Sequence, residues 1–284
     1  MKLLNFLVGG EVRAGLVRDD GVEDLSASGL WHGPVPVKRE ELAQLAQRLS
    51  APTSPVLPLD SLRVAPVVIA PEKIICVGLN YRRHAAEAHM EIPAVPAIFG
   101  KFANSLSAHQ SKIALPPVDY KYDYEAELGV VMGREAWQIS EADALSYVAG
   151  YCCVNDLSAR GPQLATTQWM AGKILDGFFP AGPFLVTTDS IPDPQNLSIR
   201  CTVNGVVRQN SSTSDMIFSV ATIIAFLSQL VTLKPGDIIA TGTPEGVMLG
   251  AKDPEWLKAG DTVSVDIDGL GRLTNHLVAP ADRR

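Results

Sequence analysis

An alternating acidic segment that runs into an apolar stretch constrains the fold of this chain more than any other feature. Asp123, Glu125 and Glu127 occupy alternate positions, and the apolar residues 128–132 follow. Side chains of a strand alternate between its two faces, so a strand here places three carboxylates on one face. Like charges on one face repel one another unless a cation lies among them, and a hard divalent cation is the simplest such partner. An edge strand whose acidic face points into water is the alternative.

A second acidic position supports a metal site. Residues 147–154 have the apolar pattern of a buried strand, which ends in Asn155 and Asp156. A carboxylate at the end of a buried strand is held rigidly and opens onto a loop, so Glu125, Glu127 and Asp156 together can supply three oxygen ligands. Magnesium prefers octahedral coordination and keeps positions that a substrate can occupy. The alternative for Asp156 is a capping role for the segment that follows it.

A histidine and a glutamate share one face of a predicted helix. We expect this helix to begin at Asn80, as its N-cap, and to end near Met90. His84 and Glu87 are three residues apart and therefore lie on the same side. A histidine oriented by a carboxylate is suited to act as a general base that activates water. A surface pair without a chemical role is the alternative.

Two further residues follow a glycine, which lets backbone and side chain approach a ligand closely. Lys173 follows Gly172, and Thr243 follows Gly242. The Gly-Lys pair is not a phosphate-binding loop, because the earlier glycine is missing and Ile174 stands where that loop has serine or threonine. The chain also lacks the complete glycine fingerprint of a dinucleotide site and the G-x-S-x-G turn of a serine hydrolase.

The composition is that of a globular protein, with 46% apolar and 19% charged residues among 284. The net charge of −7 and the lack of a Lys/Arg cluster argue against a nucleic-acid partner. No apolar run approaches the ~20 residues that a membrane-spanning helix needs, so we expect no membrane partner. The four cysteines include the adjacent pair Cys152-Cys153 and show no C-x-x-C spacing. We therefore expect reduced, buried thiols in a cytoplasmic protein.

The order of elements indicates a small module before a larger domain. Residues 2–8 and 12–18 are typical of two strands joined by a glycine turn. A proline-rich connector includes residues 51–55. We place a boundary near residue 70, which gives an N-terminal module of residues 1–69 and a main domain of residues 70–284.

The main domain is rich in strands and turns. Asn204-Gly205 lies between two strand patterns and predicts a hairpin with a type I′ turn. A second hairpin is expected where residues 262–266 lead into Asp268-Gly269. Helical patterns are confined to a few segments, chiefly residues 39–48 and 216–231. Many strands with few helices favour an α+β fold built on largely antiparallel β-structure.

The chain resembles the fumarylacetoacetate hydrolase family over about residues 70–280. Five sequence blocks in the family's order carry the resemblance: Gly78-Leu79-Asn80-Tyr81-x-x-His84-x-x-Glu87, Asp123-Tyr124-Glu125-x-Glu127-Leu128-Gly129-Val130-Val131, Asn155-Asp156-x-Ser158-Ala159-Arg160-x-x-Gln163, Gly172-Lys173, and Thr241-Gly242-Thr243-Pro244-x-Gly246-Val247. The chain looks most like the bacterial branch, which includes acylpyruvate hydrolases and hydrolases of 2,4-diketo-3-deoxy sugar acids.

The resemblance implies a mixed β-sandwich roll, preceded here by a small β-rich N-terminal module and assembled as a homodimer. It implies a Mg²⁺ or Mn²⁺ site formed by Glu125, Glu127 and Asp156. It places Asp123 outside this ligand set, a choice that the spacing of the acidic residues does not make.

The resemblance also implies roles for residues around the metal. His84 and Glu87 correspond to a catalytic dyad on a segment that closes over substrate, and Lys173 corresponds to a catalytic lysine. Four further positions correspond to substrate contacts: Lys101, Arg160, Gln163 and Thr243. The chain departs from the family pattern at residues 174–178, and at Glu245, where a small residue or proline is usual.

The activity that the resemblance implies is metal-dependent hydrolysis of a carbon–carbon bond in a 2,4-diketo acid. The substrate would be an acylpyruvate, fumarylpyruvate or a diketo-deoxy sugar acid, and a pyruvate-like product would be released. Decarboxylation of oxaloacetate, and isomerisation or hydration of a muconate-type acid, are alternatives within the family. A binding module that has lost activity is an alternative of a different class, and the intact set of site residues argues against it.

Overall fold

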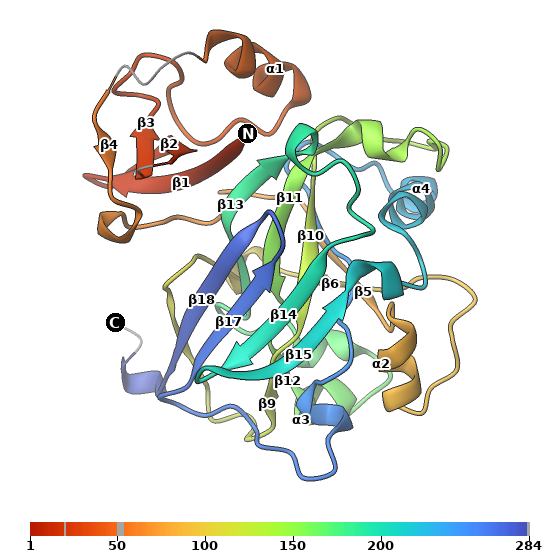
Figure 1. Ribbon diagram of the computed structural model, residues 1–284. Helices are drawn as coiled ribbons and strands as arrows, with labels where there is room; N and C mark the ends of the chain where they lie inside the picture. Colours follow the sequence, from red (N-terminus) through yellow and green to blue (C-terminus); the bar gives the residue numbers. More distant parts are fainter. Residues whose placement is uncertain (20, 50–53, 283–284) are drawn as a thin grey trace.

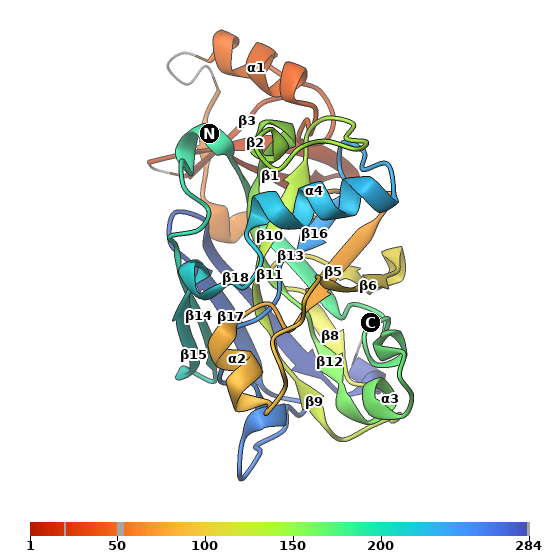
Figure 2. The same cartoon turned by 90° about the vertical axis from the view of Figure 1, so that its right-hand side faces the viewer.

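Two β-sheets packed against each other form the body of the molecule, in agreement with the expected α+β class (Figures 1 and 2). The structure, a computed structural model, describes residues 1–19, 21–49 and 54–282. The larger sheet has eleven strands in the order β4 (Val56–Leu57), β3 (Gly21–Asp24), β2 (Glu11–Arg18), β1 (Lys2–Val8), β13 (Phe179–Thr187), β11 (Val148–Asn155), β10 (Ala126–Met132), β16 (Ile238–Ala240), β5 (Ile74–Gly78) and β6 (Ala97–Lys101), with β7 (Leu106–Ser107) paired to β13.

The second sheet has five strands in the order β15 (Val206–Ser212), β14 (Ser198–Val203), β17 (Thr262–Ile267), β18 (Gly271–Val278) and β8 (Lys112–Ala114). The short strands β9 (Tyr122–Asp123) and β12 (Ser158–Ala159) pair with each other. Within the described ranges the α-helices are α1 (Arg39–Arg48), α2 (Arg82–Glu87), α3 (Arg160–Leu164) and α4 (Val220–Leu230).

The main core lies between the two sheets. Leu128 and Tyr151 of the larger sheet and Cys201 and Val265 of the second sheet belong to one buried cluster. The opposite face of the larger sheet belongs to a second cluster, to which α1 contributes Leu42. Strands β10 and β11 are therefore buried on both faces, which explains why their sequences are continuously apolar instead of alternating.

The N-terminal strands extend the larger sheet. The hairpin expected for residues 2–18 is formed by β1 and β2, and β1 pairs antiparallel with β13 of the main domain. The helix expected at residues 39–48 is α1. Of the proposed connector, residues 51–53 lie outside the described residues. The boundary near residue 70 stays a prediction.

Both predicted hairpins of the second sheet are present. Asn204 and Gly205 have φ of 51° and 79°, the positive values that a type I′ turn needs at both central positions. β17 and β18 form the other hairpin. The expectation for the cysteines also holds, because all four are free and buried.

Asn80 is not the N-cap of α2, and that prediction is wrong. The helix begins at Arg82, and its N-cap residue is Tyr81. The Asn80 side chain is instead buried and bridges two other segments. Its amide donates to the carbonyl oxygens of Thr241 at 2.7 Å and Phe218 at 3.0 Å, and its carbonyl oxygen accepts from the Phe218 N–H at 2.8 Å.

Asn80 also explains why the helix predicted for residues 216–231 is shorter than expected. The Ile217 backbone N–H donates to the backbone carbonyl oxygen of Asn80 at 2.7 Å, so this part of the chain is held outside the helix. α4 starts at Val220, after Ser219, whose hydroxyl accepts from the Thr222 N–H at 3.0 Å.

α2 also ends before the predicted position. His89 has φ of 53°, and the Met90 N–H donates to the Ala85 carbonyl oxygen. This is the left-handed C-terminal cap that usually carries glycine. A histidine in this position does not indicate the end of a helix, so the sequence pattern predicted too long a helix.

The acidic segment is not one continuous strand. β9 ends at Asp123 and β10 begins at Ala126, so Glu125 lies in the interruption and Glu127 in β10. The edge-strand alternative is excluded for these residues, because all three acidic side chains are buried.

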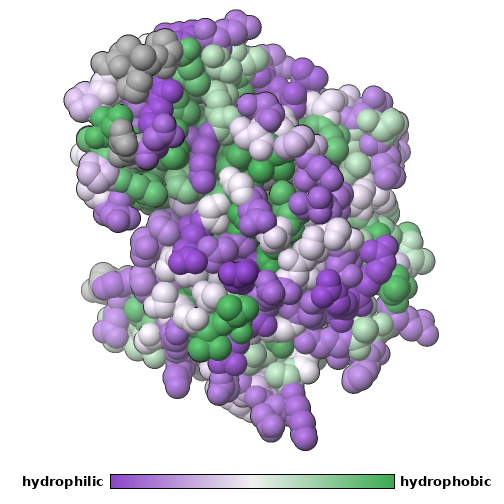
Figure 3. Space-filling view, in the orientation of Figure 1, coloured by the Kyte–Doolittle hydropathy of each residue, from purple (hydrophilic) through white to green (hydrophobic). Residues whose placement is uncertain are grey.

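The face of the molecule shown in Figure 3 is mostly polar, and its apolar patches are separate from one another. In the part of the chain that the structure describes, no helix has the length and apolar character needed to cross a membrane.

Candidate active site

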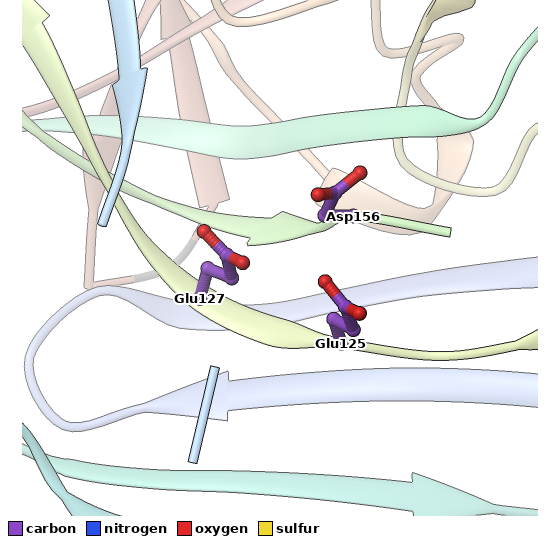
Figure 4. A group of neighbouring side chains, drawn as sticks. All are labelled: Glu125, Glu127 and Asp156. Atoms are coloured by element: carbon purple, nitrogen blue, oxygen red, sulfur yellow. The ribbon is translucent and has the colours of Figure 1, made fainter. Parts of the chain in front are cut away.

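Three carboxylates from two neighbouring strands meet inside the fold. Glu125 directly precedes β10, Glu127 lies within it, and Asp156 follows β11, which pairs with β10. One oxygen from each of the three side chains lies within 4.8 Å of the others. Figure 4 shows the three side chains as neighbours, with Glu125 and Glu127 along one segment and Asp156 just past the end of the next strand. The pairing of β10 with β11 thus brings together acids that are about thirty residues apart in the sequence.

Three cationic side chains surround this cluster. Lys173 Nζ lies 2.7 Å from Glu125 Oε2 and 2.9 Å from Asp156 Oδ2. Lys101 Nζ lies 2.5 Å from Asp156 Oδ1, and Arg160 Nη1 lies 2.7 Å from Glu125 Oε1. Glu125 and Asp156 therefore each contact two cations.

Asp123 sits beside the cluster and contacts other groups. Its Oδ2 accepts from Arg160 Nε at 2.9 Å and from Nη2 at 2.7 Å. Its carboxylate also accepts the backbone N–H groups of Met248 and Leu249, at 2.9 and 3.0 Å. Asp123 does not belong to the group of three acids whose oxygens lie within 4.8 Å of one another, and its place outside the ligand set stays a prediction.

Glu127 differs from its neighbours in its counter-charge. Its Oε2 accepts a hydrogen bond from the Gly242 N–H at 2.8 Å, whereas the ion pairs found among the described residues do not include it. Burial, together with the charges of Asp156 and Glu125, raises the pKa of Glu127 well above its ordinary value. Burial also raises the pKa of Glu125. The positive charges of Lys173 and Arg160 have a larger, opposite effect and lower the pKa of Glu125 to about 2.

The donor set fits a divalent metal ion. Glu125, Glu127 and Asp156 offer hard carboxylate oxygens, the ligand type that Mg²⁺ and Mn²⁺ prefer. With Asp123 the site holds four carboxylates and three cationic side chains, so one negative charge is left without compensation. A divalent ion among the three ligands would supply the missing positive charge next to Glu127.

His84 and Glu87 form a hydrogen-bonded pair on α2. His84 Nδ1 lies 3.2 Å from Glu87 Oε2, as the spacing of three residues predicted. Glu87 is fixed in turn by the Gly246 N–H, which lies 3.0 Å from Oε1 and 3.2 Å from Oε2. Both side chains line the same cavity as Glu125 and Glu127.

That cavity has a volume of about 440 Å³ and an open mouth. Its polar wall contains the dyad, Glu125, Glu127 and Lys173. The rest is largely apolar and includes Leu79, Met90, Phe99, Leu164, Trp169 and Leu249. Phe99 and Trp169 pack edge to face, with ring centres 6.0 Å apart, and Phe99 lies beside Lys173 Nζ. These aromatic residues were not predicted from the sequence, because a lone aromatic residue carries no signal for a cavity.

The residues expected to contact substrate are placed in different ways. Gln163 and Thr243 line the cavity; Gln163 is held by Arg160, and the Thr243 hydroxyl accepts from the side-chain amide of Gln209 at 2.8 Å. Arg160 also lines it, but its three nitrogens contact Asp123, Glu125 and Gln163.

Lys101 is buried behind Asp156 and is not among the described residues that line the cavity. Its ammonium group contacts Asp156 and the Leu157 carbonyl oxygen. Lys101 thus has a charge partner next to the carboxylate cluster, and a contact with substrate stays a prediction.

Gly172 explains how Lys173 reaches the cluster. A β-carbon at residue 172 would lie 2.3 Å from the Ala159 carbonyl oxygen and 2.5 Å from Gln163 Cβ. Only glycine permits this close approach of the backbone to α3. Lys173 is consequently fully inside the site, where the charges of Asp156 and Glu125 outweigh burial and raise the pKa of its ammonium group.

Carboxylates of a buried cluster and a His–Glu pair line one cavity, an arrangement typical of an enzyme active site. Residues 73–278 match the fumarylacetoacetate hydrolase C-terminal domain. The chain belongs to the fumarylacetoacetate hydrolase family.

Similar proteins in this family carry several activities in their names. The chain is 43% identical over 240 residues to the mitochondrial oxaloacetate tautomerase of Rattus norvegicus, which covers 84% of this chain and 77% of that protein. The structure of maleylpyruvate hydrolase from Sphingobium sp. SYK-6 superposes with a TM-score of 0.81 at 29% identity, covering 98% of this chain and 100% of that one. The structure of 2-hydroxyhepta-2,4-diene-1,7-dioate isomerase from Mycobacterium marinum superposes with a TM-score of 0.78 at 31% identity. The match covers 99% of this chain and 100% of that one.

Proposed function

We propose that this chain is a metal-dependent hydrolase that cleaves a carbon–carbon bond of a 2,4-diketo acid and releases a pyruvate-like product. Acylpyruvates, fumarylpyruvate and diketo-deoxy sugar acids are the candidate substrates. The observation that carries the proposal is that the His84–Glu87 pair and the carboxylates Glu125 and Glu127 line one cavity. A water-activating base and an enolate-stabilising site are therefore available to the same small molecule.

Glu125, Glu127 and Asp156 would hold Mg²⁺ or Mn²⁺. When bound, this ion supplies a Lewis acid for the carboxylate and 2-oxo oxygens of the substrate. The chain's own contribution is a set of ligands fixed by strand pairing and by Lys101, Lys173 and the Gly242 N–H.

His84 is the general base of the proposed reaction. The contact of Nδ1 with Glu87 Oε2 places the ring N–H there, so Nε2 remains free to accept a proton from water. The water oxygen then attacks the distal carbonyl carbon of the diketo acid. Glu87 stabilises the imidazolium that forms, and the Gly246 N–H keeps Glu87 in place.

Lys173 is suited to stabilise the tetrahedral oxyanion. An ammonium group has three N–H donors, and two of them are directed at Glu125 and Asp156. The remaining donor is available to an oxyanion in the cavity, with the Gln163 amide as a second group. Collapse of the oxyanion breaks the bond between carbons 3 and 4, and the electron pair becomes the product enolate. Its protonation gives the pyruvate-like acid.

Chemistry on oxaloacetate is the second candidate, favoured by the similarity to a protein named oxaloacetate tautomerase. Tautomerisation and decarboxylation both pass through an enolate and need no attack by water. In tautomerisation His84 would move a proton at carbon 3 of the substrate. Isomerisation of a muconate-type acid, the activity named for the Mycobacterium marinum protein, is a third candidate of the same kind.

A substrate panel separates these candidates. Purified protein with Mg²⁺ or Mn²⁺ is given acylpyruvates, fumarylpyruvate, a diketo-deoxy sugar acid and oxaloacetate, and products are identified by mass. We expect stoichiometric pyruvate and carboxylic acid from a diketo acid, and no turnover after chelation. Conversion of oxaloacetate with every diketo acid left intact would exclude the hydrolase assignment.

We further propose that the protein acts in the cytoplasm as a homodimer. Light scattering coupled to size-exclusion chromatography tests the assembly, with twice the chain mass of 30.4 kDa as the expected result.

A further inference from the structure

The helix that carries the dyad has little support of its own. α2 has six residues, and its N-cap residue Tyr81 makes no side-chain capping bond. Isolated helices of this length are not stable in water, so α2 depends on contacts with other parts of the chain. Its N-terminal half lies beside β15 and the segment that follows it (Figures 1 and 2).

Asp215 supplies the missing cap from a distant segment. Its Oδ2 accepts from the Arg83 backbone N–H at 3.0 Å, and its Oδ1 lies 3.6 Å from Arg83 Nε. The neighbouring Arg82 guanidinium donates to the backbone carbonyl oxygens of Asp215 and Met216, at 3.2 and 2.5 Å. The first turn of α2 is thus tied to residues 215–216.

Glu245 holds the same arginine from a second side. Arg83 Nη1 lies 3.0 Å from Glu245 Oε1, and the Ser211 hydroxyl donates to Glu245 Oε2 at 3.3 Å. The next residue, Gly246, donates its N–H to Glu87 at the other end of α2. One loop therefore contacts both ends of the helix, and its contact with Arg83 is made by Glu245, one of the positions at which this chain departs from the family pattern.

We propose that Arg83, held between Glu245 and Asp215, is a positioning residue that keeps α2 docked with His84 and Glu87 facing the carboxylate cluster. This inference rests on the proposed role of the dyad. Arg83 and Glu245 are not among the described residues that line the cavity, so they act on the reaction through α2.

The expected effect of losing this contact is modest and depends on salt. The side chains of Arg83 and Glu245 are 58% and 25% exposed, so water and ions screen the pair. Loss of an exposed ion pair changes an equilibrium by about 1.5-fold to fivefold. Arg83→Gln removes the contacts with both acids and should have the larger effect, whereas Glu245→Gln removes one.

Amide hydrogen exchange in the absence of substrate tests the docking directly. The informative amides are those of Ala85 and Ala88, which donate to the carbonyl oxygens of Tyr81 and His84. We expect Glu245→Gln to speed their exchange by about 1.5-fold to fivefold and to leave α4 unchanged. High salt should speed exchange in the wild type and have less effect in Glu245→Gln. Unchanged exchange at α2 in both Glu245→Gln and Arg83→Gln would overturn the proposal.

Arg272→Gln is the matched control. Arg272 is 65% exposed and pairs with Asp266 at 2.6 Å on the β17–β18 hairpin, away from α2. This variant should leave exchange at Ala85 and Ala88 as in the wild type. An equal acceleration in Arg272→Gln would show that loss of any surface ion pair loosens α2, and would contradict a specific role for Arg83.

A double-mutant cycle links docking to catalysis. The exchange rates give the fraction of α2 that is docked in each variant, and we expect kcat/KM for the diketo acid to follow that fraction. Glu245→Gln should have a much smaller effect on both quantities in an Arg83→Gln background. A kcat/KM that does not follow the docked fraction across the variants would refute the positioning role. A chain inactive on every diketo acid would refute the proposed reaction instead, and the exchange data would still decide the docking.

Discussion

Individual carboxylates of the site differ in their counter-charges, and this difference predicts opposite effects of similar substitutions. Glu125 contacts Lys173 and Arg160, so Glu125→Gln removes one negatively charged partner from each of these two buried cations. Removing one member of a buried ion pair typically costs about 3–5 kcal/mol. Glu127 accepts the Gly242 N–H, a bond that glutamine can keep, and its negative charge is unfavourable in the metal-free site.

We therefore expect Glu125→Gln to lower the melting temperature of the chelated protein and Glu127→Gln to raise it. Saturating Mg²⁺ or Mn²⁺ should stabilise the wild type by ligand linkage, by about 2.7 kcal/mol at one hundred times Kd, and should stabilise both variants less. Thermal unfolding with and without chelator measures all of these shifts. Equal destabilisation of the metal-free protein by the two substitutions would contradict the difference in counter-charge.

The dyad offers a second prediction at the scale of single residues. His84→Ala removes the proposed base and should lower kcat/KM for diketo-acid cleavage by about 10²–10⁴-fold. Enolate formation from oxaloacetate by decarboxylation needs the metal site and no attacking water, so that activity should fall less. His89→Ala is the control, because His89 lines the same cavity beyond the end of α2. Equal losses of both activities in His84→Ala would assign the dyad to enolate protonation or site closure.

At the scale of elements, Asn80 joins β5, α2 and the chain before α4, and its loss should loosen all three. Asn80→Ala leaves the Phe218 N–H and the Thr241 carbonyl oxygen without their partner inside the fold. Each buried polar group left unsatisfied costs about 1–3 kcal/mol. We expect a drop of several kcal/mol in the free energy of unfolding, measured by urea denaturation. Asn210→Ala, at an exposed position of β15, should cost much less.

Elements with local signals were predictable from the sequence, and elements fixed by distant partners were not. Asn204-Gly205 determines its own turn, and the apolar strand β11 ends at Asn155, directly before Asp156, as predicted. The same sequence pattern that predicted a cap at Asn80 cannot show that its amide is taken by Thr241, 161 residues away. Similarly, spacing places Asp123 on the acidic face but cannot reveal Arg160 as its partner.

At the scale of the whole molecule, the larger sheet, α2 and α3 contribute to the wall of one cavity, which carries both charged and apolar side chains. The fixed cations that line it, Arg160 and Lys173, both already contact carboxylates. The remaining wall is largely apolar and includes the half-exposed side chain of Leu164. A carboxylate at the distal end of a substrate would lose hydration there without gaining a free cation, which is unfavourable.

We therefore expect the wild type to prefer acylpyruvates with alkyl or aryl groups over fumarylpyruvate and oxaloacetate, measured as kcat/KM at saturating metal. Leu164→Arg places a cation in the apolar part of the wall and should raise the relative kcat/KM for fumarylpyruvate, by up to about fivefold for a partly exposed pair. Leu164→Gln is the control, because it adds polarity and no charge. If the wild type prefers the dicarboxylates and Leu164→Arg changes nothing, the distal group binds elsewhere, and Arg160 must release Asp123 or Glu125 to receive it.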